Sequence, residues 1–461
     1  MTIEQSQSIP TEKGWPLLGI LPNFFNGDPY EYLKNIMLNH GDFVKLYIGP
    51  QPVYLVSHPD YIQRILRDNY PNYAKPEMFY NTGKETLGNG LVVSEGDLWL
   101  RQRRMIQPHL HRKQLTNLFS DMVDAISEIL GKWDILAQTH EVFDLSGKMG
   151  EVVIRVLTHT MFGKDTLTTE KATDIGIRIR RIFKYGGGAI YSSMLPKWFP
   201  IPGRQQFLQD LAVIRETVHE IIAKGRQEKD ESASLIQMLI NSVDEESHEQ
   251  MTEQQLFDEV MTILIGGYDT TVTALTWLEV AIHNHPEILE NLRKEIDEVL
   301  NGRIPSFDDI PRLTYTRQVF MEVLRMYTVI PFLPRALNND DQLGEYHLPA
   351  KALILVFYHG VHHNPKVWDK PEIFDPERFK TERMAGQHMF AYVPFSAGPR
   401  KCAGDDFAIL EGTLAIAMII QKYDIKLVPN QNLTAGMGVS MHPRNTLKAT
   451  LSTRKLPKVV D

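Results

Sequence analysis

The sequence has almost no cysteine: Cys402 is the only one among 461 residues. A lone cysteine cannot form an internal disulfide, so nothing in the chain requires an oxidising compartment. It also cannot by itself supply the four ligands that a structural zinc ion needs. Cys402 can therefore be a small buried side chain, a reactive thiolate or a single metal ligand.

Basic charge and long apolar runs are also scarce. Lysine and arginine number 49 against 57 aspartates and glutamates, and no basic patch with interleaved aromatic residues stands out, so nucleic acid is a poor candidate partner. The longest apolar runs, such as residues 414–420, fall far short of the roughly 18 to 20 residues that cross a bilayer. The amino terminus does not have the pattern of a signal peptide. We therefore expect a soluble, cytoplasmic protein with no transmembrane segment.

The chain lacks repeats, low-complexity tracts and Gly/Ser linkers. One domain over residues 1–461, with residues 1–14 as a flexible tail, is the simplest organisation. Apolar residues recur at helical spacing in most of the chain, for example in residues 114–133 and 206–227. Residues 43–56 hold two β-rich runs and predict a hairpin. The predicted fold class is mainly α (α+β), with a large helical part and small β-sheets.

The surroundings of Cys402 read FSAGPRKCAGDDFA, and a largely apolar helical pattern follows from residue 405. A thiol just before a helix amino terminus, with Arg400 and Lys401 beside it, is expected to ionise readily, because the helix dipole and the cations favour the thiolate. As a nucleophile, Cys402 would need a general base nearby. As a ligand, one sulfur is enough to hold a haem iron.

Phe395, Gly398, Arg400, Cys402 and Gly404 fill the pattern F-x-x-G-x-R-x-C-x-G. On these residues the chain resembles the cytochrome P450 family. The resemblance implies a P450-like fold, haem b as the cofactor and the Cys402 thiolate as the axial ligand of its iron. The other four residues of the pattern are implied to bind the cofactor with it.

A second motif, EVLR, places Glu322 and Arg325 three residues apart, where they can pair on one face of a helix. Such pairs are usually solvated, and alone this one says little. The resemblance adds Arg378, in the segment PERF, and implies a buried structural triad of these three residues. Removing one member would leave an unpaired buried charge, at a cost of about 3 to 5 kcal/mol.

The motif IGGYDTT lies within an apolar helical stretch. Its two glycines weaken the helix and a threonine hydroxyl can bond to the carbonyl four residues earlier, so we expect the helix to open locally. A site of close helix packing is the alternative. The resemblance implies instead that Gly266 and Gly267 lie over the distal face of the haem. It implies that Asp269 and Thr270 are catalytic and help to deliver protons to dioxygen.

Arginines and a tryptophan are implied to bind the haem propionates, because a guanidinium fork suits a carboxylate. Trp99 and Arg103 fit the family pattern W-x-x-x-R, and Arg335 and Arg400 are further partners by position. His362 and His363, like His109 and His111, have no acidic or cysteine partner at a metal-binding spacing, so we assign no metal to them.

The resemblance also implies a substrate pocket with few charges, which favours an apolar guest. Its predicted lining consists of Phe79, Tyr80, Phe183, Ile190, Met194, Ile263, Gly266, Gly267, Val329, Ile330, Phe332, Met437 and Val439. The chain looks like soluble bacterial members that act on terpenoids and related secondary metabolites. A fatty acid is a weaker candidate, because no arginine is obviously placed for its carboxylate. Residues 194–202 could roof the pocket or touch a membrane.

Dioxygen activation needs electrons, and the 59 residues after Cys402 are too few for a flavin or iron–sulfur domain. We therefore expect a separate donor, a ferredoxin or flavodoxin with an NAD(P)H-dependent reductase. A cationic cluster could attract it, or could simply be a solvated surface. That cluster consists of Arg101, Arg104, Arg112, Lys113 and Lys401.

The predicted function is that of a haem-thiolate monooxygenase, which inserts one oxygen atom from O2 into a hydrophobic small molecule by hydroxylation or epoxidation. A peroxide-driven or rearranging enzyme of the same fold is one alternative, although Asp269 and Thr270 argue against it. A haem-based gas-binding protein is another, and would need an output domain or partner. A helical protein without a cofactor is the remaining alternative.

Overall fold

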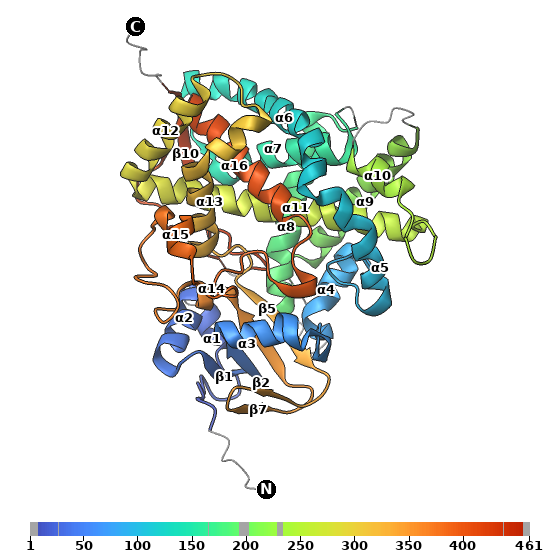
Figure 1. Ribbon diagram of the computed structural model, residues 1–461, viewed down its shortest axis with the longest axis vertical. Helices are drawn as coiled ribbons and strands as arrows, with labels where there is room; N and C mark the ends of the chain where they lie inside the picture. Colours follow the sequence, from blue (N-terminus) through green and yellow to red (C-terminus); the bar gives the residue numbers. More distant parts are fainter. Residues whose placement is uncertain are drawn as a thin grey trace.

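The computed structural model describes residues 8–25, 27–164, 166–192, 202–227, 234–436 and 438–454. Helices predominate, which confirms the predicted fold class (Figure 1). They are α1 (Leu21–Phe25), α2 (Pro29–His40), α3 (Pro59–Gln63), α4 (Glu77–Leu87), α5 (Gly96–Ile106), α6 (Arg112–Thr139), α7 (Leu145–Leu157), α8 (Thr169–Ser192), α9 (Arg204–Gln227), α10 (Leu235–Asn241), α11 (Glu253–Asn284), α12 (Pro286–Leu300), α13 (Thr314–Met326), α14 (Tyr358–His362), α15 (Thr381–Met384) and α16 (Asp405–Lys422). In the described ranges, no helix has the length and apolar character to span a membrane.

Three small sheets accompany the helices. The largest has the strand order β1-β2-β8-β5-β3, the second β4-β10-β9, and the third pairs β6 with β7. The strands are β1 (Phe43–Ile48), β2 (Gln51–Val56), β3 (Tyr73–Ala74), β4 (Phe143–Asp144), β5 (Phe332–Leu337), β6 (Asp341–Leu343), β7 (Tyr346–Leu348), β8 (Leu353–Phe357), β9 (Tyr423–Leu427) and β10 (Lys448–Thr453).

The predicted hairpin is present as β1 and β2, which pair antiparallel from Phe43 with Val56 to Ile48 with Gln51. The described part of the predicted tail lies along β1 and is not free. The N–H of Lys45 donates to the carbonyl of Pro10 at 2.8 Å, and the N–H of Glu12 donates to the carbonyl of Lys45 at 2.9 Å.

The five-stranded sheet is buried on both faces. In β8, Ile354 and Val356 belong to one apolar cluster, while Leu353, Leu355 and Phe357 belong to another. This division follows from the alternation of side chains along a strand. A third and larger cluster fills the space between the helices. Figure 1 shows the sheet at one end of the molecule and most of the helices at the other.

Helix α11 crosses the middle of the helical part (Figure 1). Its 32 residues correspond to about 48 Å of helix, and a capping box of Thr252 and Gln255 fixes its start. The hydroxyl of Thr270 donates to the carbonyl of Gly266 at 2.8 Å, as expected. The predicted local opening is absent, because the helix is continuous and packs against α7, α8, α13 and α16.

Candidate active site

Cys402 lies in a tight loop just ahead of α16. Its N–H donates to the carbonyl of Phe395 at 2.9 Å, which closes the loop. Gly398 has a φ of 70°, and a Cβ at this position would lie 1.9 Å from the carbonyl oxygen of Leu66. No other residue type fits there, because a side chain would meet this backbone oxygen. The loop therefore packs directly against the backbone at Leu66, and this contact helps to fix the position of Cys402.

The thiol of Cys402 has exposed surface, yet enough protein surrounds it that burial raises its pKa. The two observations agree if the exposed surface faces an internal space. The N–H of Gly404 and the charges of Arg103 and Lys401 lower the pKa, but burial outweighs them. The expected ease of ionisation is therefore wrong for the thiol itself, because desolvation penalises the charged form more than its neighbours stabilise it.

In the middle of α11, one stripe of residues is less buried than the residues around it. Ile263, Gly266 and Thr270 are half-buried and lie three and four residues apart, so they share one face. A Cβ on Gly266 would meet no atom within 4 Å, which places open space in front of this face. A Cβ on Gly267 would lie 3.1 Å from the side chain of Leu157, so this glycine faces α7 and not the open space.

Asp269 and Thr270 are adjacent but have different surroundings. Thr270 belongs to the half-buried stripe, whereas Asp269 is buried and accepts a hydrogen bond from the hydroxyl of Ser440 at 2.5 Å. Burial raises the pKa of Asp269 to about 6, although Ser440 and Arg180 act in the opposite direction. Asp269 is thus a buried acid that titrates near neutrality, one residue away from a hydroxyl on the open face.

Lys75, Arg335 and Arg400 lie close enough for their charges to act on one another. The guanidinium of Arg400 lies 3.7 Å from the centroid of the Trp99 ring. Arg400 and Lys75 both donate to the carbonyl oxygen of Ser94, each at 2.8 Å. Burial, followed by the positive charges of Arg400 and Arg335, lowers the pKa of Lys75 to about 7. Because partly buried positive charges that repel one another are stabilised by a negative charge, this cluster favours the binding of an anion.

Two other predicted residues make contacts that the sequence did not indicate. Arg335 is buried in β5 and donates to the hydroxyl of Tyr80 at 3.0 Å, so a predicted cofactor ligand touches a predicted pocket residue. Arg103 donates to the carbonyl of Lys401 at 2.7 Å and to Oε1 of Gln107 at 2.6 Å. The structure thus places Arg103 against the backbone of the cysteine loop and not among the three cations.

Glu322, Arg325 and Arg378 come together in the interior. Arg325 donates to both carboxylate oxygens of Glu322, at 2.7 and 2.8 Å, and both side chains are fully buried. Arg378 lies 3.4 Å from Glu322 and donates to the carbonyls of Asp369 and Lys370. These bonds tie α13 to the loop that follows α14.

The predicted pocket residues are partly accessible where the structure describes them. Val439 has 38% of its surface exposed, and Val329 is buried. Six others are half-buried: Phe79, Tyr80, Phe183, Ile263, Ile330 and Phe332. Met194, Met437 and the side chain of Ile190 lie outside the described residues, as does most of the predicted roof, residues 193–201.

The histidines of the second half have structural surroundings. The two ring nitrogens of His362 contact the hydroxyl of Thr328 at 2.8 Å and the N–H of Val393 at 3.0 Å. Burial lowers the pKa of His362 and of His363 well below the usual value, which keeps both neutral. Across the described ranges, no group of three His, Cys, Asp or Glu side chains could hold a metal ion.

Comparison with known proteins identifies the family, because the family model for cytochrome P450 matches residues 9–447. The chain belongs to the cytochrome P450 family. It is 30% identical over 442 residues to cyclooctat-9-en-7-ol 5-monooxygenase of Streptomyces melanosporofaciens, covering 92% of this chain and 93% of that protein. It is 28% identical over 431 residues to pentalenene oxygenase of Streptomyces avermitilis, covering 92% and 93%. It is 29% identical over 471 residues to the chloroplastic carotene epsilon-monooxygenase of Arabidopsis thaliana, covering 96% and 86%.

These matches confirm the predicted enzyme class: the chain is a cytochrome P450 monooxygenase, and its family binds haem through an axial cysteine thiolate. The geometry of this P450 fits that cofactor. Cys402 offers one accessible sulfur, the face of α11 at Gly266 borders open space, and Lys75, Arg335 and Arg400 form a cluster of positive charge of the kind that carboxylates bind.

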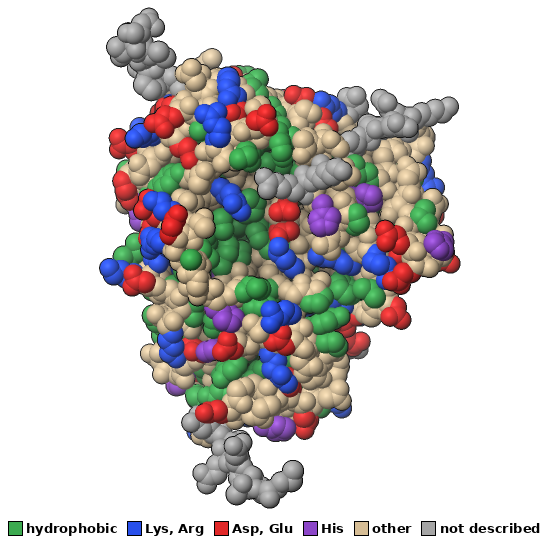
Figure 2. Space-filling view, viewed as in Figure 1, with side chains coloured by type: hydrophobic (Ala, Val, Ile, Leu, Met, Phe, Trp, Pro, Cys, Tyr) green, Lys and Arg blue, Asp and Glu red, His purple; other side chains and the backbone are tan. Residues whose placement is uncertain are grey.

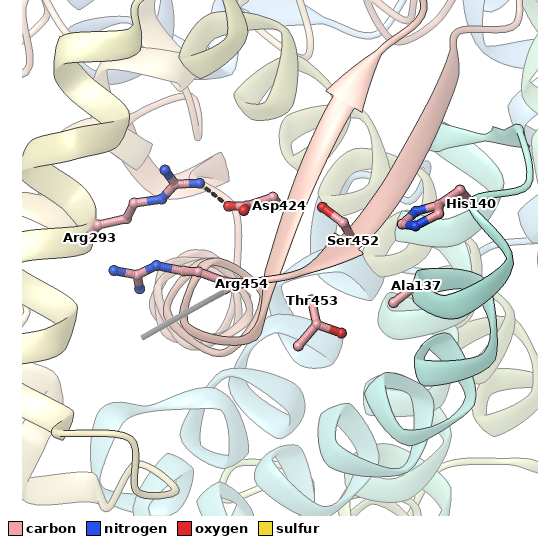
Figure 3. Close-up of a pocket in the computed structure, with 7 residues that line it drawn as sticks. All are labelled: Ala137, His140, Arg293, Asp424, Ser452, Thr453 and Arg454. Carbon is pink, nitrogen blue, oxygen red and sulfur yellow. Dashed lines mark hydrogen bonds and ion pairs between the residues drawn. The ribbon is translucent and has the colours of Figure 1, made fainter. Parts of the chain in front are cut away.

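A surface pocket of this P450 lies elsewhere. Figure 3 shows it beside β10 and α6, with a volume of about 600 Å³. Two arginines line it, and both already have partners: Arg293 pairs with Asp424, and Arg454 with Asp297 at 2.6 Å. None of the predicted site residues lines this pocket.

Three residues of the basic cluster, which could attract an electron donor or be a solvated surface, are paired with carboxylates. Arg101 pairs with Glu249, Arg104 with Asp244, and Lys401 with Asp405. The side chains of Arg112 and Lys113 lie outside the described residues. On the face drawn in Figure 2, cationic and anionic side chains are interspersed.

Sequence reasoning missed two residues of this site. Lys75 joins Arg400 at the carbonyl of Ser94, and Ser440 holds Asp269. Neither lies in a recognisable motif. Ser440 contacts a residue 171 positions away, and Lys75 is influenced by the charges of Arg335 and Arg400 from the other end of the chain.

Proposed function

We propose that this P450 hydroxylates or epoxidises an apolar small molecule, and that terpenoids are its substrate class. The observation that carries the proposal is the half-buried stripe of Ile263, Gly266 and Thr270, which borders open space near apolar side chains. The names of the relatives support the class, since cyclooctat-9-en-7-ol, pentalenene and carotene are all terpenoids.

Thiolate-ligated haem, when bound, supplies the reductive activation of dioxygen, so that RH + O2 + 2 e⁻ + 2 H⁺ becomes ROH + H2O. In this chain the sulfur of Cys402 would hold the iron, and the positive charges of Lys75, Arg335 and Arg400 would neutralise the propionates. Asp269 holds a proton inside the protein, and the hydroxyl oxygen of Thr270, whose own hydrogen is donated to the carbonyl of Gly266, offers an acceptor for a proton-carrying group at the open face of α11. The apolar side chains orient the guest and exclude water.

An absorption titration of the ferric protein tests the substrate class. Pentalenene and a larger terpenoid would be compared with a fatty acid and an aromatic amide. We expect a saturable shift of the Soret band toward its high-spin position with the terpenoids only. A shift of the Soret band with the fatty acid alone would contradict the terpenoid proposal and make fatty acids the substrate class. Cys402→Ala is the control for the ligand, because it should abolish the thiolate-type carbon monoxide spectrum.

We further propose that electrons come from a separate ferredoxin or flavodoxin with an NAD(P)H-dependent reductase. Because Arg101 and Arg104 are already paired with carboxylates, we expect docking to depend only weakly on their charge. The rate of haem reduction by each donor, measured at low and high salt in the wild type and in Arg104→Ala, checks this. Product formation with hydrogen peroxide but with neither donor would favour the peroxide-driven alternative.

A further inference from the structure

A residue far along the chain holds the carboxyl group of Asp269. The hydroxyl of Ser440 donates to Oδ2 of Asp269 at 2.5 Å, and Ser440 is completely buried. In the part of the chain that the structure describes, this hydroxyl is the side-chain group hydrogen-bonded to Asp269. An O–H donor stabilises the ionised form of a carboxyl group, so the proton affinity of Asp269 depends on Ser440.

Ser440 sits in a turn that is anchored on three sides. The N–H of Met441 donates to the carbonyl of Val329 at 2.8 Å, and the carbonyl of Met441 accepts a hydrogen bond from the indole of Trp277 at 2.5 Å. The N–H of Gly438 donates to the hydroxyl of Tyr30 at 3.3 Å. The position of the Ser440 hydroxyl is therefore set by α11, by α2 and by the segment before β5.

The same turn borders the predicted substrate pocket. Val439 has 38% of its surface exposed, and its Cγ2 lies 3.6 Å from the place of a Cβ on Gly186 in α8. Val329, a second predicted pocket residue, is bonded to Met441. Val439 precedes Ser440 in the chain, and Val329 is bonded to Met441, which follows it. A shift of Val439 or Val329 on binding of a guest would therefore act on the segment that positions the hydroxyl.

The charged groups near Asp269 come from several elements. Arg180 lowers the pKa of Asp269 by its charge, but its own hydrogen bond goes to Asp144 at 3.0 Å. Burial lowers the pKa of His442, which leaves it neutral at pH 7. The titratable groups that act on this region are Asp144, Glu151, Tyr268, Arg180, Lys184 and His442.

We propose that Ser440 is a positioning residue for Asp269, and that through it the occupant of the pocket sets how readily Asp269 gives up its proton. The inference rests on the proposed role of Asp269 and Thr270 in proton delivery. The turn at residues 438–442 then has a function beyond lining the pocket. It links the molecule bound in the pocket to the carboxyl group of Asp269.

Infrared titration of the haem-loaded protein tests the first link. The carboxyl band of Asp269 is identified by its loss in Asp269→Asn. We expect Ser440→Ala to move the titration midpoint upward by about one pH unit, a tenfold change in proton affinity, and Ser440→Thr to restore it. Ser452→Ala, on β10, is the matched control and should leave the midpoint unchanged. An unchanged midpoint in Ser440→Ala overturns the proposal.

Econazole tests the second link, because an imidazole with a bulky apolar group binds haem iron and fills the pocket whatever the natural substrate. Its binding is followed by the Soret band. We expect bound econazole to shift the Asp269 midpoint in the wild type and to leave it unchanged in Ser440→Ala. Equal shifts in both proteins, or no shift in the wild type, would show that the pocket does not act through Ser440.

These readouts separate this inference from the proposed function. If Asp269 and Thr270 do not deliver protons, Asp269→Asn and Thr270→Ala will couple electrons to product as well as the wild type does. The infrared shifts would still report on Ser440. If the proton role holds and the infrared midpoint does not respond to Ser440→Ala, the positioning role alone fails.

Discussion

Gly266 and Gly267 are neighbours in α11 with different surroundings, and alanine at each position has a different expected effect. Ala in a helix is favoured over Gly by about 1 kcal/mol. Gly266→Ala should therefore raise the free energy of unfolding by up to that amount, because its Cβ meets no atom within 4 Å. Gly267→Ala should be less stable than Gly266→Ala by about 1 kcal/mol, since Leu157 must move away. Urea unfolding of both variants checks the order, and equal stability would contradict it.

Thr270 differs from the other threonines of α11 in its half-buried position. Thr270→Ala should divert electrons to hydrogen peroxide several-fold more than the wild type, because the hydroxyl at the open face is lost. Thr270→Ser should restore coupling. Thr276→Ala is the matched control, since Thr276 makes the same bond to the carbonyl four residues earlier but is fully buried. Peroxide is measured against NAD(P)H consumed, and full coupling in Thr270→Ala would rule out the role.

At the residue scale, short motifs predicted those features that depend only on residues close together in the chain. The loop around Cys402 and the pair of Glu322 and Arg325 are of this kind, and both have the expected local geometry. Contacts between distant segments were predictable only where the family resemblance supplied them, as for Arg378 and Glu322. Ser440 reaches Asp269 across 171 positions, and nothing in its own surroundings in the sequence marks it. The thiol pKa of Cys402 was misjudged for a related reason, because burial depends on the whole fold.

At the scale of elements, the buried triad ties α13 to the segment that contains Arg378. We expect Arg378→Ala to lower the free energy of unfolding by about 3 kcal/mol, because Glu322 loses a buried ionic partner and the carbonyls of Asp369 and Lys370 lose their donor. Arg383→Ala is the matched control: Arg383 pairs with Asp375 at the surface and should contribute less than about 1 kcal/mol. Thermal unfolding of the haem-loaded variants gives the comparison. A similar loss of stability in both variants would show that Arg378 contributes no more than a surface ion pair does.

Hydrophobic periodicity was enough to predict most of the helices and the hairpin of β1 and β2, because these patterns are local. The two glycines of α11 do not have the effect that their helix propensity predicts. Taken alone, they predict a weakened helix, but packing against the surrounding helices, α7, α8, α9, α13 and α16 among them, keeps it continuous. The basic cluster was read as a charged surface, whereas Asp244 and Glu249, from the segment before α11, pair with two of its arginines.

At the scale of the whole molecule, buried histidines make stability depend on pH. Burial lowers the pKa of His359 to about 3 and those of His362 and His363 well below the usual value. In the unfolded chain these groups bind protons below about pH 6.5. Their contribution is therefore complete above that pH and is lost as the pH falls, by up to about 1.4 kcal/mol per pH unit for each group.

Buried glutamates have the opposite effect. Burial raises the pKa of Glu259, Glu279 and Glu411 to about 8 each, so the folded protein keeps protons that the unfolded chain releases above about pH 4.5. Stability falls as the pH rises through this window. Because the two sets offset each other between about pH 4.5 and 6.5, we expect the free energy of unfolding to be highest there.

Glu279 provides the test, since it lies in the last part of α11, beyond the half-buried stripe. Glu279→Gln should reduce the loss of stability between pH 6.5 and 7.5 by about 1.4 kcal/mol. Urea unfolding at both pH values, followed by tryptophan fluorescence, gives the difference. A decline parallel to that of the wild type would mean that Glu279 is ionised in the folded protein.

The cluster of Lys75, Arg335 and Arg400 bears on how a cell makes this protein. Lys75, Arg335 and Arg400 repel one another until an anion joins them. A newly synthesised chain would therefore complete this edge of its core only when haem arrives, and would stay open to proteases there until then. The amount of the protein that accumulates should follow the rate of haem biosynthesis as well as the rate of translation.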